Sequence, residues 1–381
     1  MDQNLRLRRE LVARCRRIVV KAGTRLLTDP ARFRELIAGI AFLRQRKFKV
    51  MLVSSGAVGT GMRALGLEKR PRQLSEVQAL AAIGQGKLMA LYDAECRKFG
   101  FQTAQLLLTA ADLRSRERYL NVSNCIHALW RDDVLPIINE HDSVSVDELK
   151  FGDNDTLAGM LGAMLGADLT VILTTEQGLR VRNADGSLGE RVSLAEKITP
   201  EMIASAGDTD NNSMSIGGMI SKLRAAAVVT EAGAHLWIAD GREKGILERI
   251  AAGDDVGTLF CPRRARLDAR KCWIKYFART AGSITVDAGA AEAVEKHGKS
   301  LLPSGATRIA GTFKRGDTVE IRDPAGRVIA RGLSNYGSEE CDKLLGKHQK
   351  ELTGLLGSDA DAELVHRNNL VLQGAAGGAL R

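Results

Sequence analysis

Residues 17–24 read RIVVKAGT, a short apolar run that ends in a lysine and a glycine-containing turn. Similar runs, separated by longer helical stretches, recur up to about residue 240. This alternation is typical of a parallel sheet covered by helices, whose strands are apolar on both faces. The sequence therefore predicts an α/β fold, an open, mostly parallel sheet with helices on both faces, with strands at residues 17–21, 49–53, 101–107, 134–138, 169–173 and 235–239.

The chain has 381 residues, 44% of them hydrophobic, which is more than one ordinary compact unit needs. The alternation stops at the Pro- and Arg-rich stretch CPRRARLDARKCW, residues 261–273. Beyond it, residues 318–321 and 327–332 predict a hairpin around a Pro-Ala-Gly turn, with helices at 288–297 and 338–348. We predict a first domain at residues 1–260, a linker at 261–277, a small β-rich domain at 278–370 and a tail at 371–381.

The composition excludes several classes of protein. With 27% charged and 4% aromatic residues, the chain is neither disordered nor collagen-like. The six cysteines are scattered without metal-ligand spacing, which favours reduced thiols in the cytoplasm and argues against structural zinc. The sequence has no apolar run of the ~20 residues that span a bilayer, and the Arg-rich start precedes no long apolar segment. We expect no membrane segment, no secretion and no protein-held metal.

Two of the predicted strands end in groups that bind anions. The first is followed by Lys21-Ala22-Gly23-Thr24, and the second by Ser54-Ser55-Gly56-Ala57 at the start of a helix. A lysine, exposed amides and the positive end of a helix all favour a negatively charged ligand. Taken singly, each motif is better explained as a strand-end lysine or a helix cap than as a ligand site.

Carboxylates and amides gather near the fourth predicted strand, which ends in Asn139-Glu140-His141-Asp142. Gly152-Asp153-Asn154-Asp155 then opens a helix that has large apolar residues on one side and a small face at Ala158, Gly159, Gly162 and Ala163. Asp153 can be explained as a helix cap. The whole set, however, suits a ligand that carries both an ammonium and a carboxylate, and one aspartate could orient lysines around a phosphate.

Residues 215–222, SIGGMISK, precede another predicted helix. Glycines and a lysine at a helix start can hold a phosphate, although this is not the GxxxxGK[ST] loop. The motif gains weight beside Lys21, because two lysines can neutralise a transferring phosphoryl group from both sides.

Six strings now resemble one known family in order and spacing: VVKAGTRLL, VSSGAVGTGM, LLLTAADLRSRERYLN, LPIINEHDSV, DELKFGDNDTLAG and GGMISKLRAA. They are similar to the glutamate 5-kinases of the amino acid kinase family, and residues from about 278 to 370 resemble the PUA domain that often follows. The resemblance implies that Lys21 and Lys222 contact the ATP phosphates and the transferring group, with Asp155 organising both lysines. It implies glutamate contacts at Ser55, Gly56, Ala57, Asn139, Asp142, Asp153 and Asn154. It implies nucleotide contacts at Lys21, Thr174, Thr175, Ile216, Gly217, Gly218, Met219, Ile220, Ser221 and Lys222.

The implied reaction converts L-glutamate and ATP, with Mg²⁺, to L-glutamyl 5-phosphate and ADP, the first step of proline biosynthesis. The resemblance also implies inhibition by L-proline, a dimer or tetramer, and transfer of the product to a glutamyl phosphate reductase. The chain departs from the family pattern at Thr175, at Ile216, at His141, which we interpret as a packing neighbour, and at the aromatic and basic stretch 273–279.

Two other interpretations stay open. Residues 261–381 hold 20 Lys/Arg and 14 Asp/Glu, so this basic third, which resembles a PUA domain, could bind RNA. The rest is nearly charge-balanced and has no aromatic RNA platform. Alternatively, the same fold could phosphorylate aspartate, acetylglutamate, carbamate or a nucleoside monophosphate. The string at residues 151–155 and the appended module favour glutamate.

Overall fold

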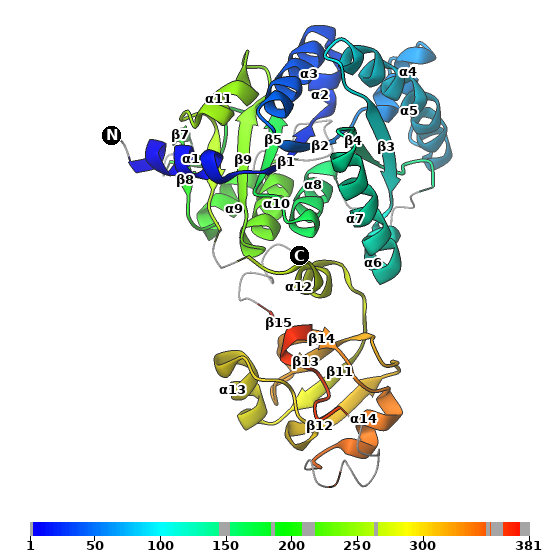
Figure 1. Cartoon of the computed structure of the whole chain (residues 1–381), viewed down its shortest axis with the longest axis vertical. Helices are drawn as coiled ribbons and strands as arrows, with labels where there is room; N and C mark the ends of the chain where they lie inside the picture. The colour runs from blue at the N-terminus through cyan, green and yellow to red at the C-terminus, as the bar shows by residue number, and fades with distance from the viewer. Residues whose placement is uncertain are drawn as a thin grey trace. The chain divides into compact units, whose positions relative to one another are not determined.

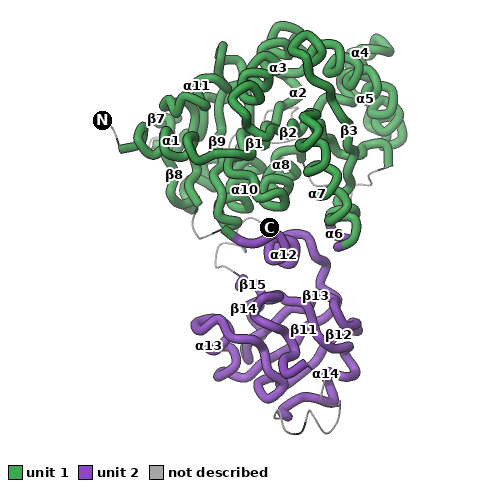
Figure 2. The backbone as a smooth tube through the Cα atoms, in the orientation of Figure 1, with its two compact units in different colours: residues 1–113, 117–266 green, residues 114–116, 267–381 purple. Residues whose placement is uncertain are grey.

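The computed structural model describes residues 3–144, 153–183, 187–207, 218–262, 266–347, 351 and 361–373. The chain divides into two compact units, residues 1–113 with 117–266, and residues 114–116 with 267–381 (Figure 2). Each unit has its own sheet.

The first unit is built on an eight-stranded sheet with the order β3-β4-β2-β1-β5-β9-β10-β8. All its strand pairs are parallel except β9 with β10. All six predicted strands are present, with shifted ends in several cases. The strands of this unit, including a separate β6–β7 hairpin, are β1 (Arg17–Ala22), β2 (Lys49–Val53), β3 (Thr103–Leu108), β4 (Leu135–Glu140), β5 (Leu169–Thr174), β6 (Arg180–Arg182), β7 (Leu188–Arg191), β8 (Leu194–Ala195), β9 (His235–Asp240) and β10 (Thr258–Phe260).

Helices cover both faces of this sheet, as the sequence predicted (Figure 1). Alternate residues of one strand serve opposite faces: Val171 packs in the core under α3 and α11, and Ile172 packs in the core under α9 and α10. The helices are α1 (Gln3–Arg14), α2 (Thr24–Thr28), α3 (Pro30–Gln45), α4 (Ala57–Ala64), α5 (Leu74–Arg97), α6 (Ala110–Arg114), α7 (Arg116–Arg131), α8 (Asn154–Leu165), α9 (Pro200–Gly207), α10 (Met219–Glu231) and α11 (Ile246–Ala252).

The small face predicted for α8 allows a close helix contact. A Cβ atom built at Gly159 would lie 3.0 Å from the Cα of Ala225 in α10, so a larger side chain would push the two helices apart. Asp155 lies near the start of α8, and Lys222 lies near the start of α10. The close packing therefore brings these two residues toward the same edge of the sheet.

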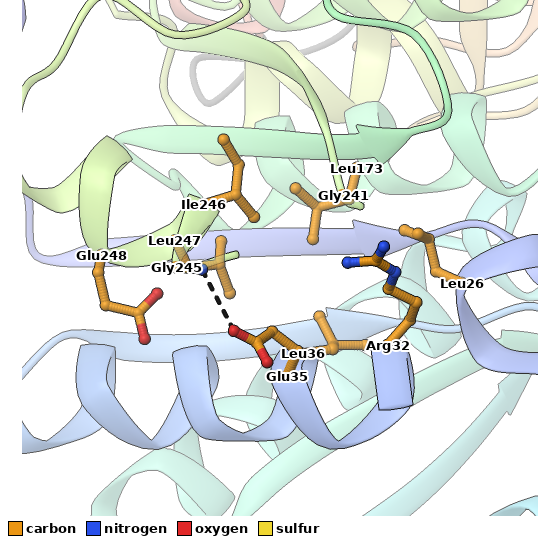
Figure 3. A pocket seen from close by; sticks show the side chains of 10 residues that line it. All are labelled: Leu26, Arg32, Glu35, Leu36, Leu173, Gly241, Gly245, Ile246, Leu247 and Glu248. Carbon is orange, nitrogen blue, oxygen red and sulfur yellow. Dashed lines mark hydrogen bonds between the residues drawn. The ribbon is translucent and has the colours of Figure 1, made fainter. Parts of the chain in front are cut away.

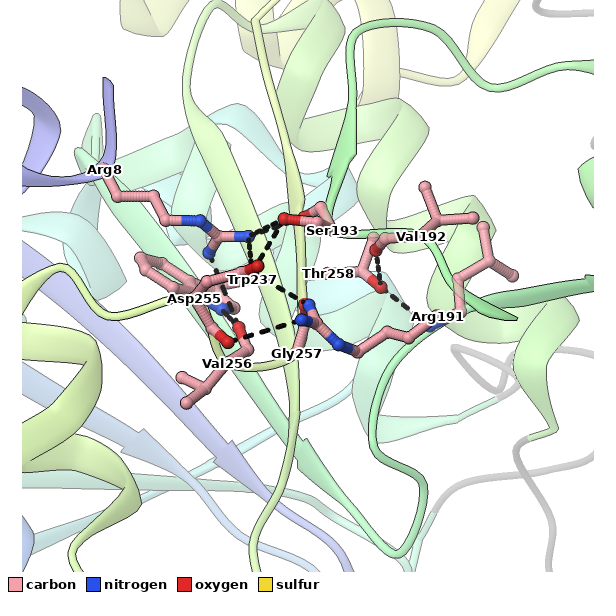
Figure 4. A network of polar contacts seen from close by, with 10 residues as sticks. Arg8, Arg191, Val192, Ser193, Trp237, Asp255, Val256, Gly257 and Thr258 are labelled. Atoms are coloured by element: carbon pink, nitrogen blue, oxygen red, sulfur yellow. Dashed lines mark hydrogen bonds and ion pairs between the residues drawn. The ribbon is translucent and has the colours of Figure 1, made fainter. Parts of the chain in front are cut away.

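A buried arginine attaches the N-terminal helix to the far edge of the sheet (Figure 4). Arg8 is 0% exposed, and its Nη2 donates to the carbonyl oxygen of Ser193 at 2.6 Å and to Asp255 at 3.1 Å. Its guanidinium also lies 4.5 Å from the ring centroid of Trp237. The Arg-rich start is therefore fixed to the first unit by contacts that the sequence analysis did not predict.

The second unit contains a five-stranded sheet with the order β12-β11-β13-β14-β15. The predicted hairpin is β13 with β14, and the predicted helix at 288–297 is α13, while the helix predicted at 338–348 ends at Leu344 in α14. The elements are α12 (Ala269–Cys272), η3 (Trp273–Phe277), β11 (Thr280–Val286), α13 (Ala288–His297), η4 (Pro303–Gly305), β12 (Ala306–Gly311), β13 (Thr318–Arg322), β14 (Val328–Leu333), α14 (Ser338–Leu344), η5 (Arg367–Asn369) and β15 (Leu370–Leu372).

Part of the predicted linker is folded. Within residues 261–277, the division between the units falls after Arg266, and the stretch from Ala269 to Phe277 forms α12 and the π-helix η3. Trp273, Ile274 and Phe277 are buried, and η3 contacts β14 and β15. Burial of these apolar side chains explains why a stretch with a linker-like composition becomes helical. Across both units, none of the helices in the described residues is long and apolar enough to cross a membrane.

We expect His235 to make the first unit sensitive to mild acid. Burial lowers the pKa of this side chain from 6.5 to about 4. Below pH 6.5 the unfolded chain binds a proton that the folded chain does not bind until about pH 4, so stability falls across that window by about 3 kcal/mol. Hydrogen exchange of β9 peptides from pH 7 to pH 4 should show this loss in the wild type and a smaller loss in His235→Gln. Equal pH profiles would contradict the prediction.

Candidate active site

The predicted site residues follow strands whose carboxyl ends meet at one edge of a parallel sheet, where open α/β folds bind ligands. Lys21 is near the end of β1, Asn139 is near the end of β4, and Thr174 ends β5. Ser55 and Gly56 lie between β2 and α4, and Gly56 has a φ of 92°. Topology therefore brings together groups that are up to about 150 residues apart in sequence.

At the centre of this edge, one carboxylate joins two lysines. Asp155 is 1% exposed; its Oδ1 lies 2.6 Å from the Nζ of Lys21, and its Oδ2 lies 3.0 Å from the Nζ of Lys222. Ser221 also donates to Oδ2 at 3.1 Å. Lys21 and Lys222 are 8% and 6% exposed. The structure thus places both predicted lysines on the predicted aspartate.

Burial alone would raise the pKa of Asp155, but the charges and hydrogen bonds of the two lysines outweigh it and hold that pKa below its ordinary value. The carboxylate is therefore ionised at neutral pH. With two ammonium groups and one carboxylate, the cluster carries a net positive charge in a buried setting, where charge interactions are stronger than in water. It can attract a polyanion.

A second group of predicted residues forms an amide cluster beside the lysines. The Nδ2 of Asn154 lies 2.8 Å from the carbonyl oxygen of Ser54, 2.8 Å from the hydroxyl of Ser55 and 3.1 Å from the Oδ1 of Asn139. Asn139 in turn donates to the Oε1 of Gln85 at 3.0 Å. Gln85 was not predicted. Its sequence signal is the pair of glycines around it in AIGQGK, since glycine inside a helix is unfavourable without a local reason.

Asp153 caps α8, which is the structural role that the sequence analysis gave as an alternative to ligand binding. Its Oδ1 accepts from the backbone N–H of Thr156 at 2.7 Å. Burial raises the pKa of Asp153, and the nearby charge of Asp155 raises it further. Asp142 is half-buried two residues beyond β4. His141 donates its backbone N–H to the carbonyl oxygen of Leu108 at 2.9 Å and so continues the β3–β4 pairing.

The predicted nucleotide contacts are only partly described. Ile216 and Gly217 lie outside the described residues. Gly218 precedes α10 and has no side-chain cap, and the carbonyl oxygen of Gly218 accepts from the Nζ of Lys222 at 3.3 Å. The side chains of Met219 and Ile220 pack against the core. The carbonyl oxygens of Thr174 and Thr175 accept from the N–H of Gly241 and from Arg242, respectively.

A hollow lies next to the end of β5, between α3 and the start of α11 (Figure 3). The N–H of Gly245 reaches across it to Glu35 at 3.4 Å, and Arg32 donates to the carbonyl oxygen of Arg242. None of the residues that line it belongs to the predicted site. We assign it no role.

Comparison with known proteins identifies what each part of the chain is similar to. Residues 16–240 match the model of the amino acid kinase family, and residues 282–356 match that of the PUA domain. A protein named glutamate 5-kinase from Thioalkalivibrio sulfidiphilus is 43% identical over 374 residues, which cover 96% of this chain and 99% of the relative. Proteins of the same name from Burkholderia multivorans and Burkholderia thailandensis are each 42% identical over 371 residues, covering 96% of this chain and 100% of each relative.

Removing the charge of Asp155 should destabilise the first unit. Asp155→Asn leaves two buried ammonium groups without their counter-charge, a change that costs about 3–5 kcal/mol. Because the folded pKa of Asp155 lies below its unfolded value of ~3.9, the stabilisation is present at neutral pH and is lost as pH falls through the folded pKa. Hydrogen exchange of β1 and β5 peptides should therefore show a large difference between wild type and variant at pH 7 that narrows in acid. Equal protection at pH 7 would argue that the carboxylate does not compensate the lysines.

Proposed function

The chain belongs to the amino acid kinase family and, within it, to the glutamate 5-kinases, and we propose that it transfers the γ-phosphoryl group of ATP to the side-chain carboxylate of L-glutamate. The products are L-glutamyl 5-phosphate and ADP. The observation that carries this proposal is the placement of Lys21 and Lys222, 201 positions apart, on the single carboxylate of Asp155 (222 − 21 = 201).

The acceptor in this reaction needs no general base. A glutamate side chain has a reference pKa of ~4.3 and is already ionised at neutral pH. The barrier is electrostatic instead, because an anion must approach a polyphosphate and the leaving oxygen gains negative charge. Fixed positive groups in a buried site lower such a barrier efficiently.

Lys21 and Lys222 supply these fixed positive groups. Each ammonium is held by Asp155, so its position is set before substrates bind. Backbone N–H groups at the start of α10, which Gly218 leaves without a side-chain cap, add further donors for the phosphates. We infer that the lysines lie on either side of the transferring group.

Magnesium would be bound at this site mainly through the phosphates of ATP. Asp155 is already occupied by two lysines, and the described residues contain no cluster of three or more His, Cys, Asp or Glu side chains arranged for a metal. Phosphate oxygens and water would then provide most of the ligands of Mg²⁺, as is usual for this ion. The ion would supply additional charge neutralisation on the phosphates.

The amide cluster is suited to the amino acid. Neutral amides and hydroxyls can bind an ammonium and a carboxylate at once, and Asn139, Asn154 and Ser55 are held together by hydrogen bonds. We propose that glutamate lies between this cluster and the lysine pair, with Asp142 and Asp153 facing its ammonium and the Gly56-Ala57 amides facing a carboxylate. Thr174, Thr175 and residues 216–222 would surround the nucleotide.

The physiological role follows from the product. An acyl phosphate hydrolyses readily, so prompt transfer to a reductase is chemically favourable, and we propose that this transfer leads to proline. Inhibition by L-proline, a dimeric or tetrameric assembly and a cytoplasmic location stay predictions. RNA binding also stays a prediction, supported by the match of residues 282–356 to the PUA domain.

The acceptor can be identified with a panel of amino acids. Glutamate, aspartate, acetylglutamate, carbamate and a nucleoside monophosphate should be compared by ADP release, with hydroxylamine added to trap any acyl phosphate as a hydroxamate. We expect ADP and hydroxamate in equal amounts with glutamate and little product with the others. Preference for another acceptor, or RNA retention without any ATP turnover, would overturn the proposal.

Lys222→Met should reduce turnover without unfolding the protein. Loss of one fixed positive group at the transferring phosphoryl should lower kcat by about 10²–10³-fold. The matched control is Lys69→Met, because Lys69 is exposed between α4 and α5. Steady-state kinetics and circular dichroism of both variants provide the measurement. A near-normal kcat in Lys222→Met would remove this lysine from the mechanism.

A further inference from the structure

Gln85 occupies an unusual position on α5. It is 8% exposed and lies between Gly84 and Gly86 within the helix. A Cβ atom built at Gly84 would lie 1.8 Å from the carbonyl oxygen of Ala57, so the backbones of α5 and α4 are in direct contact here. This contact places Gln85 beside the turn between β2 and α4, which also carries Ser55.

The hydrogen bonds of the amide cluster fix the orientation of each amide. The backbone N–H of Glu140 donates to Asn139 at 2.9 Å, so the accepting atom of Asn139 must be its oxygen. Its nitrogen therefore donates to Gln85, and the contacting atom of Gln85 must be Oε1. Likewise, the backbone carbonyl of Ser54 can only accept, so the atom of Asn154 facing it must be Nδ2.

These orientations leave two buried atoms without a partner among the described residues: the Nε2 of Gln85 and the Oδ1 of Asn154. A buried polar atom without a hydrogen bond is costly, and native proteins keep few of them. One of these two atoms is a donor and the other is an acceptor. Together they complement a ligand that carries a carboxylate and an ammonium.

We propose that Gln85 determines specificity for the amino acid substrate by donating from Nε2 to the α-carboxylate of the bound glutamate. This rests on the proposed function: the γ-carboxylate must face Lys21 and Lys222 to receive the phosphoryl group, which leaves the α-carboxylate for the free amide donor. Through Oε1, the same side chain holds Asn139, and Asn139 contacts Asn154.

The first test is Gln85→Met, which keeps the size of the side chain and removes both the Nε2 donor and the Oε1 acceptor. A hydrogen bond to a charged group corresponds to about a 10- to 100-fold change in affinity. We expect the KM for glutamate to rise by about this factor, the KM for ATP to stay unchanged and the glutamate-induced rise in Tm to shrink. Lys87→Met, an exposed position on the same helix, is the matched control. Equal increases in both KM values would indicate a structural role and overturn the proposal.

Gln85→Glu separates the two atoms of the amide. The variant keeps an acceptor for Asn139 but replaces the donor with a carboxylate. At mildly alkaline pH, which favours the ionised form, glutamate affinity should fall at least as far as in Gln85→Met. Wild-type affinity in this variant would show that Gln85 acts only through Asn139, and would overturn the proposed contact.

A substrate analogue identifies the group that Gln85 contacts. 4-Aminobutyrate has the amine and the reacting carboxylate of glutamate but lacks the α-carboxylate. If Gln85 binds the α-carboxylate, replacing glutamate with 4-aminobutyrate should lower the affinity of the wild type by a larger factor than it lowers the affinity of Gln85→Met. Equal losses would overturn the assignment. Affinity is measured here from the ligand-induced rise in Tm, which does not depend on turnover. A failure of the proposed reaction would instead appear in the ADP-release assay of the wild type.

Discussion

One buried carboxylate determines how this site is built. Asp155 compensates two ammonium groups that would otherwise be costly to bury, and it can do so only because α8 and α10 start at the same edge of the sheet. Contact at Gly159 keeps the two helices close, and β1 brings Lys21 to the same point. The sheet order and the helix packing must therefore keep the carboxylate of Asp155 within ion-pair distance of both lysines.

The three residues that open α8 serve three different purposes. Asp153 caps the N-terminus of the helix, Asn154 belongs to the neutral amide cluster, and Asp155 forms ion pairs with the two lysines. Because they are consecutive, the positively charged part and the neutral part of the site are rigidly linked through one helix terminus. Phosphate and amino acid are therefore expected to be held at a fixed separation, which favours reaction between them.

Much of this arrangement was accessible from the sequence. Apolar runs predicted the strands, small residues predicted the close face of α8, and the resemblance to a known family predicted the pairing of Lys21, Asp155 and Lys222. Arg8, the helical stretch 269–277 and Gln85 were missed. Each depends on partners distant in sequence, such as Asp255 for Arg8, and local periodicity carries no information about such partners.

The long-range anchoring of Arg8 also bears on how the chain folds during synthesis. Its partner Asp255 follows 247 positions later, so the first helix leaves the ribosome long before its binding site exists. At ordinary translation rates the delay is on the order of ten seconds or more. Until then the helix lacks its tertiary contacts, and this early segment is available to chaperones. We therefore expect docking of the N-terminal helix to be a late step in the folding of the first unit.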